Sequence, residues 1–369
     1  MDFLLQKGLS PHDLDSFGYS PFTFSLVIGN LEMATKLSSL PEETLMADPN
    51  WNNKPTAFSH DALVDNISTY LKLKFASVDD PAIRFSVPNI NGGVCNGWSW
   101  HIALEASDDI AKMHDFFEMT SIFSKWDGTL ESLKTIPEAY QSTYASLDEM
   151  FFDLTNAIYH FYGQRDADIG VSFHDRAKQV SLVSNKRNVE GICDFGLPDF
   201  TREEYEQVLS AFQEIANDMI IDVRSHTHDV TYYQKSLNEI YYFDPNIALK
   251  LPPHATYASA LKANTPYMSG INALTYWHAH PDQMDPKVRE KANKITDSLI
   301  EKLIMQNPER NTPYKIESII KHACVSGMPR LLERLVNHPQ IKEMKTQELF
   351  NKMIQWAALK KNYEILRIV

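Results

Sequence analysis

The central part of the chain carries hydrophobic positions at helical spacing in some stretches and in alternation with polar positions in others. Residues 58–73 and 99–120 repeat apolar positions every three or four residues, which predicts helices there. Ser146–Glu149 and Thr201–Glu204 each place a hydroxyl residue three positions before a glutamate, a capping box that predicts the start of a helix. The central region is therefore expected to contain at least four helices.

Runs in which apolar and polar residues alternate predict strands in the same region. These runs cover residues 169–173, 179–183, 219–223, 228–233 and 240–243. Helices that come mostly first and antiparallel strands that come mostly later are typical of an α+β domain. We expect residues 50–255 to form such a domain, with a helical half and a sheet half.

The N-terminal stretch contains helix-start and turn residues that are typical of a helical hairpin. Pro21, in Ser20-Pro21-Phe22, suits the first turn of a helix, and Gly29-Asn30 suits the tight turn to a second helix. Together with Gly18, this register over residues 4–37 resembles an ankyrin repeat, which we assign to residues 1–45. A single repeat cannot bury its own apolar face, so it is expected to pack on another part of the chain.

The C-terminal stretch repeats itself with a similar period. Ala323-Cys324 and the apolar positions after it recur 34 residues later at Ala357-Ala358, close to the ankyrin period of about 33. Gly270–Tyr276 echoes Gly18–Phe24, which predicts a degenerate third repeat whose helix pair extends to about Gln306. Residues 256–369 are therefore expected to form degenerate ankyrin-like repeats.

Composition narrows the functional classes. The net charge of -13 over 369 residues argues against nucleic-acid binding through a general basic surface, and 43% hydrophobic with 22% charged residues is typical of a globular chain. Three cysteines give no disulfide framework, which suits a reducing compartment. We expect no membrane span, and the N-terminal residues lack the pattern of a classical signal peptide.

One of these cysteines, Cys95, has a local sequence that is typical of a nucleophilic cysteine. It follows Gly92-Gly93 and precedes a stretch that predicts a helix. The positive end of a helix dipole lowers the pKa of a thiol and favours the nucleophilic thiolate. The glycines allow a tight turn in which backbone N–H groups can face a developing oxyanion.

The predicted sheet supplies a base and an acid for this thiol. His228 opens one predicted strand, and Asp244 ends the next, so a hairpin would bring the two side chains together. The separation of Cys95 and His228 along the chain lies in the range of about 130–150 residues that papain-like enzymes use. The sequence thus predicts a Cys-His-Asp triad.

The motifs around these residues resemble a known family. Gly93-Val-Cys-x-Gly-x-Ser99, a later histidine that opens a strand, and Phe243-Asp-Pro-Asn246 are similar to the papain-fold cysteine proteases of the YopT/AvrPphB type, effectors that bacteria inject into host cells. The resemblance covers roughly residues 55–255. It implies a papain-like cysteine protease domain, flanked here by α-helical ankyrin-like repeats.

The resemblance also implies roles for individual residues. Cys95 is similar to the family nucleophile, His228 to its general base and Asp244 to the residue that orients the base. Asn89 matches the position of the oxyanion-stabilising amide, usually a glutamine, and Asn91 is an alternative. The sequence departs from the family at this asparagine and at Trp98, which replaces a small aliphatic residue.

Simpler interpretations of the same residues remain open. Cys95 can be a structural thiol, and Asp244 can merely begin the Pro-Asn turn. His226 can replace His228 as the base, or the two histidines can bind a metal ion.

The other candidate residues give no reason to expect a metal or cofactor. His278 and His280 have no cysteine or carboxylate at ligand spacing, so packing is the expected role of this pair. Cys193 lies among apolar neighbours and is expected to be buried and inert. We expect no cofactor and no metal.

The expected function combines these domains. A bacterial effector, exported without a classical signal peptide and delivered to the host cytosol or nucleus, would hydrolyse a host protein that the ankyrin-like repeats recruit. The same triad also serves deamidation, transglutamination and acyl transfer. A scaffold whose papain-like domain has decayed is the alternative from another class.

Overall fold

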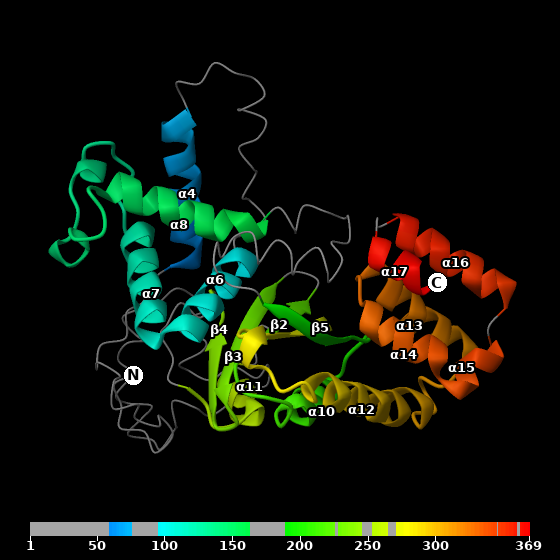
Figure 1. Cartoon of the computed structure of the whole chain (residues 1–369). Helices are drawn as coiled ribbons and strands as arrows, with labels where there is room; N and C mark the ends of the chain where they lie inside the picture. Colours follow the sequence, from blue (N-terminus) through cyan, green and yellow to red (C-terminus); the bar gives the residue numbers. More distant parts are fainter. Residues whose placement is uncertain are drawn as a thin grey trace, which may run out of the picture. The chain divides into compact units, whose positions relative to one another are not determined.

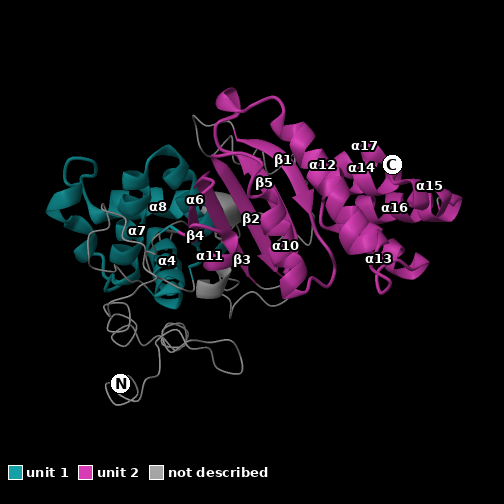
Figure 2. Ribbon diagram, turned by 90° about the horizontal axis from the view of Figure 1, so that it is seen from below, with its two compact units in different colours: residues 1–163, 243–253, 264–267 teal, residues 164–242, 254–263, 268–369 magenta. Residues whose placement is uncertain are grey.

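The structure is a computed structural model that describes residues 59–75, 95–162, 189–225, 228–245, 253–264, 271–344, 346–359 and 362–369. The chain divides into two compact units (Figure 2). Unit 1 comprises residues 1–163, 243–253 and 264–267, and unit 2 comprises residues 164–242, 254–263 and 268–369. The sheet and the C-terminal helices thus belong together, whereas the sequence grouped the sheet with the preceding helices.

Unit 1 is helical in its described residues. Its α-helices are α4 (His60–Phe75), α6 (Cys95–Asp108), α7 (Ile110–Ser124) and α8 (Leu147–Tyr162), with short 3-10 turns at Ser132–Lys134 and Glu138–Tyr140. Helix α6 packs on both α7 and α8, and α4 packs on α7 (Figure 1). All four helices bury apolar residues, so the core of unit 1 is a helix-on-helix core.

An aromatic cluster holds three of these helices together. The rings of Phe123 and Phe151 stack at 3.9 Å, and Tyr70 meets both edge-on. The Tyr70 hydroxyl donates to the carbonyl of Asp148 at 2.9 Å, so this buried polar group is satisfied. Aromatic pairs of this kind stabilise a core by about 1 kcal/mol beyond the area that they bury.

The predicted helices are confirmed, with one difference in unit 1. Residues 99–120 lie in two helices instead of one, because Asp109 ends α6 and caps α7 by accepting a hydrogen bond from the N–H of Ala111 at 2.9 Å. Ser146 caps α8 as expected, since its hydroxyl accepts from the N–H of Glu149 at 3.3 Å. Asp109 was not recognised as a cap because it stands inside a continuous apolar spacing.

Unit 2 is built on a five-stranded sheet with the order β1-β5-β2-β3-β4. The strands are β1 (Glu190–Phe195), β2 (Met219–Ser225), β3 (Asp229–Ser236), β4 (Glu239–Phe243) and β5 (Ile271–His278). Pairs β1–β5, β5–β2 and β2–β3 are antiparallel. The fold class α+β is confirmed, as are the three strands predicted between residues 219 and 243. The runs at 169–173 and 179–183 lie outside the described residues.

The prediction of a third repeat at Gly270–Tyr276 is wrong. Residues 271–278 form β5, which lies between β1 and β2, and nearly all of its side chains are buried. A strand covered on both faces reads as a continuous apolar run, which periodicity cannot separate from a buried helix. The helix pair expected up to Gln306 is also wrong, because α12 (Val288–Ile300) continues directly into a π-helical turn at Glu301–Met305.

One face of the sheet is covered by α10 (Arg202–Phe212) and α11 (Tyr257–Asn264). Ile221 pairs with both Tyr276 and Tyr232, so these side chains share a face. Phe212 of α10 lies 4.4 Å from the Tyr276 ring, and Tyr257 of α11 lies 5.5 Å from the Tyr232 ring. This aromatic layer forms the core of unit 2.

The C-terminal helices form two pairs that repeat the same hydrogen bonds. The pairs are α13 (Pro313–Val325) with α14 (Pro329–Asn337) and α16 (Gln347–Leu359) with α17 (Tyr363–Ile368), with the short α15 (Pro339–Met344) between them. The hydroxyl oxygens of Thr312 and Thr346 cap the first helix of each pair. Met328 N–H donates to Ala323 O, and Asn362 N–H to Ala357 O, both at 2.9 Å.

These bonds recur at the 34-residue spacing that the sequence predicted. The two pairs stack, with α13 against α16 and α14 against α17. Thr312 and Pro313 form a local helix-start signal at α13, beyond the helix starts predicted above.

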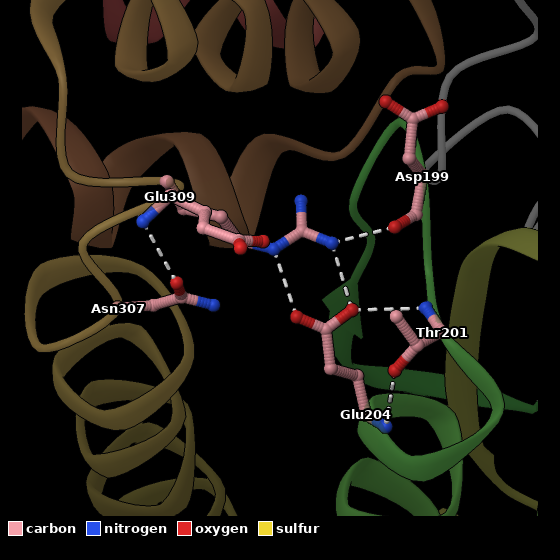
Figure 3. A network of polar contacts seen from close by, with 6 residues as sticks. Asp199, Thr201, Glu204, Asn307 and Glu309 are labelled. Carbon is pink, nitrogen blue, oxygen red and sulfur yellow. Dashed lines mark hydrogen bonds and ion pairs between the residues drawn. The ribbon is translucent and has the colours of Figure 1, made fainter.

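An ion pair joins the sheet part of unit 2 to the segment before its C-terminal helices (Figure 3). Arg310 precedes α13 and donates from Nε and Nη2 to the two carboxylate oxygens of Glu204, at 2.8 and 2.7 Å. Arg310 also donates to the carbonyl of Asp199. Glu204 completes the predicted capping box with Thr201, with bonds of 2.9 and 3.1 Å. The predicted start of α10 is therefore confirmed, and its glutamate has a second partner.

Replacing Arg310 with alanine is expected to lower the free energy of unfolding by about 2–4 kcal/mol, because it leaves the nearly buried Glu204 carboxylate without its cation. Urea denaturation of the variant and the parent measures this difference. Arg367→Ala removes a pair whose arginine is mostly exposed and serves as the control, for which no measurable change is expected. Equal stability of the two variants would contradict this prediction.

Candidate active site

Cys95 is the first residue of α6, as the sequence predicted. The helix is buried on almost every side, and Trp100, Ile102 and Ala103 are at most 1% exposed. Cys95 itself is 2% exposed. The candidate nucleophile therefore lies at the start of a helix in the interior of unit 1.

Two neighbours of Cys95 have packing roles that explain part of the motif. A Cβ atom on Gly97 would lie 1.9 Å from the carbonyl oxygen of Ile158, so only glycine allows α8 to approach α6 this closely. The Trp98 indole N–H donates to Thr120 Oγ1 at 3.2 Å, and its ring packs on Phe117. Trp98, the departure from the family pattern, is thus part of the core between α6 and α7.

His228 closes the turn between β2 and β3. The Ser225 N–H donates to the His228 carbonyl at 2.9 Å, and the His228 N–H donates to Ser225 Oγ at 2.9 Å. These bonds fix the backbone of His228 at the beginning of β3, where the sequence placed it. His226, the alternative base, lies outside the described residues.

His228 and Asp244 lie just outside the strands of the hairpin. His228 directly precedes β3, and Asp244 directly follows β4. Within the hairpin, the rings of Tyr232 and Tyr242 lie 4.9 Å apart on the neighbouring strands β3 and β4. Asp229, which follows His228 directly, is the first residue of β3 and is 8% exposed.

The candidate residues do not all fall within one compact unit. Cys95 and Asp244 belong to unit 1, and His228 belongs to unit 2. Asp244 is 4% exposed and directly follows β4. Asn89 and Asn91, the two candidates for the oxyanion site, lie outside the described residues.

The other two thiols are unsuited to nucleophilic attack. Burial raises the pKa of Cys193, in β1, well above its ordinary value, and the neighbouring Asp194 raises it further. Burial raises the pKa of Cys324 to about 12. Both side chains are therefore protonated at neutral pH, and the prediction that Cys193 is buried is confirmed.

Three further histidines are buried or hydrogen-bonded within the fold. Burial lowers the pKa of His254 to about 4, so its imidazole is neutral at neutral pH. Burial also lowers the pKa of His278, whose Nδ1 accepts from the N–H of His280 at 3.1 Å. His322 Nε2 lies 2.7 Å from the carbonyl oxygen of Asn272. Among the residues that the structure describes, no three His, Cys, Asp or Glu side chains converge as ligands of a metal ion.

A row of buried polar residues, not among the predicted site residues, crosses the other face of the sheet. Asp194, Thr275, Asp222 and Thr231 are cross-strand neighbours on β1, β5, β2 and β3, and each is at most 3% exposed. The Arg224 Nε donates to Asp222 Oδ2 at 2.9 Å. The single aspartates inside the apolar runs of β1 and β2, Asp194 and Asp222, were the available signal.

No described helix is both long enough and apolar enough to cross a membrane. No protein-family model, curated protein or solved structure matches this chain.

Proposed function

We propose that the protein is a thiol hydrolase, in its simplest form a cysteine protease, with Cys95 as the nucleophile. Cys95 Sγ would attack a carbonyl carbon of the substrate, and His228 would accept the thiol proton and return it to the leaving amine. Water would then hydrolyse the thioester and release the acid. Asp244 would hold the imidazole, and the Cys95 N–H with Asn89 or Asn91 would stabilise the oxyanion.

The observation that carries this proposal is the position of Cys95 at the start of α6, because the positive end of a helix dipole favours a nucleophilic thiolate. The positions of His228, directly before β3, and of Asp244, directly after β4, support the roles of general base and orienting acid that the resemblance implies.

We further propose that the helix pairs at the C-terminus are degenerate ankyrin-like repeats that recruit a host protein. The 34-residue recurrence of caps and turn bonds supports this interpretation. The predicted repeat at residues 1–45 lies outside the described residues. With the papain-like resemblance, this gives a bacterial effector that acts inside a host cell. Deamidation, transglutamination and acyl transfer remain alternative reactions of the same triad.

A second candidate function is a binding scaffold without turnover. The observation that favours it is the burial of Cys95, which is only 2% exposed, since an enzyme must admit its substrate to the thiol. Gly97 and Trp98 have packing roles that do not require catalysis. The two functions differ in the reactivity of Cys95.

Labelling with iodoacetamide at pH 7 tests the proposed enzyme. We expect rapid modification of Cys95 in the native protein and slow modification of Cys193 and Cys324, which serve as internal controls. His228→Ala is expected to slow the labelling of Cys95 by at least about tenfold, because the thiolate loses its base. Absent labelling of Cys95, or labelling that His228→Ala leaves unchanged, would favour the scaffold.

Mass spectrometry of a host-cell lysate incubated with the protein then separates the reactions. New peptide termini indicate cleavage, and a mass increase of about one unit on glutamine or asparagine indicates deamidation. Cys95→Ala should abolish either change and, in a pull-down, should retain the substrate. Modification that persists with Cys95→Ala would exclude this thiol as the nucleophile.

A further inference from the structure

The turn between β2 and β3 is closed by a side chain as well as by the backbone. In a regular antiparallel pair, two opposite residues exchange N–H and C=O groups in both directions. At this turn the Ser225 N–H donates to the His228 carbonyl at 2.9 Å, whereas the His228 N–H donates to Ser225 Oγ, also at 2.9 Å. The Ser225 hydroxyl in turn donates to the His228 carbonyl at 2.7 Å. Both polar groups of the His228 backbone are therefore bonded to the serine hydroxyl.

Ser225 is itself fixed by the centre of the sheet. It is the last residue of β2, and it pairs with Ile271 of β5 on the side of β2 away from β3. The register between β2 and β5 shifts between Arg224 and Ser225. Register shifts of this kind redirect a side chain and are frequent next to active sites. Here the shift occurs at the residue whose hydroxyl holds His228.

The next cross-strand pair stabilises the same end of the hairpin. Arg224 lies opposite Asp229 in the register of β2 and β3, so opposite charges face each other one step inside the turn. The Arg224 Nε also donates to the buried carboxylate of Asp222 at 2.9 Å. The register of the hairpin is thus fixed up to Arg224 and Asp229. The hydroxyl bonds extend this order by one residue pair, to His228.

We propose that Ser225 is a positioning residue for His228, a role that rests on the proposed function of His228 as the general base. The imidazole is attached to the Cα that lies between the two bonded groups, the His228 N–H and C=O. Loss of the hydroxyl removes a bond on each side of this Cα and loosens the position of the ring. A displacement of about 1 Å in a catalytic group is sufficient to slow a reaction by about 100-fold.

The rate at which iodoacetamide labels Cys95 at pH 7 tests this role in the full chain. Ser225→Thr and Ser225→Val have similar shapes and both suit a strand, but only threonine keeps the hydroxyl. We expect Ser225→Thr to label within about twofold of the parent and Ser225→Val to label about three- to tenfold more slowly. Ser225→Ala should be as slow as Ser225→Val. Ser236→Ala, at the other end of β3, is the control and should label like the parent.

A double-mutant cycle distinguishes positioning from support of the fold. If Ser225 acts through His228, adding Ser225→Val to His228→Ala slows the labelling no further. An equal slowing in both backgrounds would overturn the proposal, because the serine would then act independently of the base. The same holds if Ser225→Val labels as fast as Ser225→Thr while His228→Ala is slow. Labelling that His228→Ala itself leaves unchanged contradicts the proposed function, and the positioning role with it.

Discussion

Replacing Gly97 with alanine is expected to lower the free energy of unfolding of unit 1 by about 3 kcal/mol or more. The added Cβ would lie 1.9 Å from the carbonyl oxygen and 2.9 Å from the carbonyl carbon of Ile158. Both are backbone atoms of α8, so the contact cannot be relieved by rotating a side chain. The two helices have to separate, and the interface between α6 and α8 loses part of its packing.

Thermal or urea denaturation followed by circular dichroism measures this loss. Ala106→Gly, the reverse change at another buried position of α6, is the control and should cost about 1 kcal/mol through helix propensity. A Gly97→Ala variant that is no less stable than Ala106→Gly would show that α8 does not approach α6 as described. The result also bears on Cys95, because a displaced α6 would move the candidate nucleophile.

The second large effect is expected at Asp194, whose buried carboxylate caps α14 from across the fold. Its oxygens accept from the backbone N–H groups of Leu331 at 2.8 Å and Arg330 at 3.2 Å. The N-cap residue of α14, Met328, provides no side-chain hydrogen bond to the helix. Asp194 of β1 therefore acts as the cap of α14. Burial raises the pKa of Asp194 to about 7, although the two N–H bonds and the Arg330 charge lower it in part.

This raised pKa predicts how stability depends on pH. Below about pH 4 the carboxyl is protonated in both the folded and the unfolded chain, and its full contribution to stability is present. As the pH rises towards 7, the unfolded chain ionises freely while the folded chain resists ionisation. The free energy of unfolding should therefore fall between about pH 4 and pH 7, by up to about 4 kcal/mol from this group.

The variant Asp194→Asn should remove this part of the pH dependence. The measurement is the difference in unfolding free energy between parent and variant at several pH values from 4.5 to 8, which cancels the other titrating groups. Glu290→Gln is the control. The hydrogen bond from Lys294 lowers the pKa of Glu290, so its difference from the parent should be flat over this range. An equally flat difference for Asp194→Asn would disprove the assignment.

Local signals in the sequence were sufficient for the helices of unit 1, for α10 and for three strands of the sheet. The capping boxes at Ser146 and Thr201 mark helices α8 and α10. The alternation after residue 219 gives β2, β3 and β4. Each of these signals lies within a single helix or strand. The capping hydrogen bonds and the side-chain periodicity do not depend on residues far away in the chain.

The errors arose where a segment takes its structure from distant residues. β5 is a strand because β1 and β2 flank it on both sides, and its own residues do not distinguish a buried strand from a buried helix. The roles of Gly97 and Asp194 depend in the same way on α8 and α14. No pattern around either residue contains its partner.

For the candidate site, the sequence by itself determined that Cys95 begins a helix and that His228 and Asp244 flank neighbouring strands, since helix starts and strand alternation are local properties. Only the tertiary structure decided that Cys95 lies in a buried helix. It also decided that the sheet joins the C-terminal helices in one unit. Burial and strand order depend on contacts between residues far apart in the chain, which a local pattern does not encode.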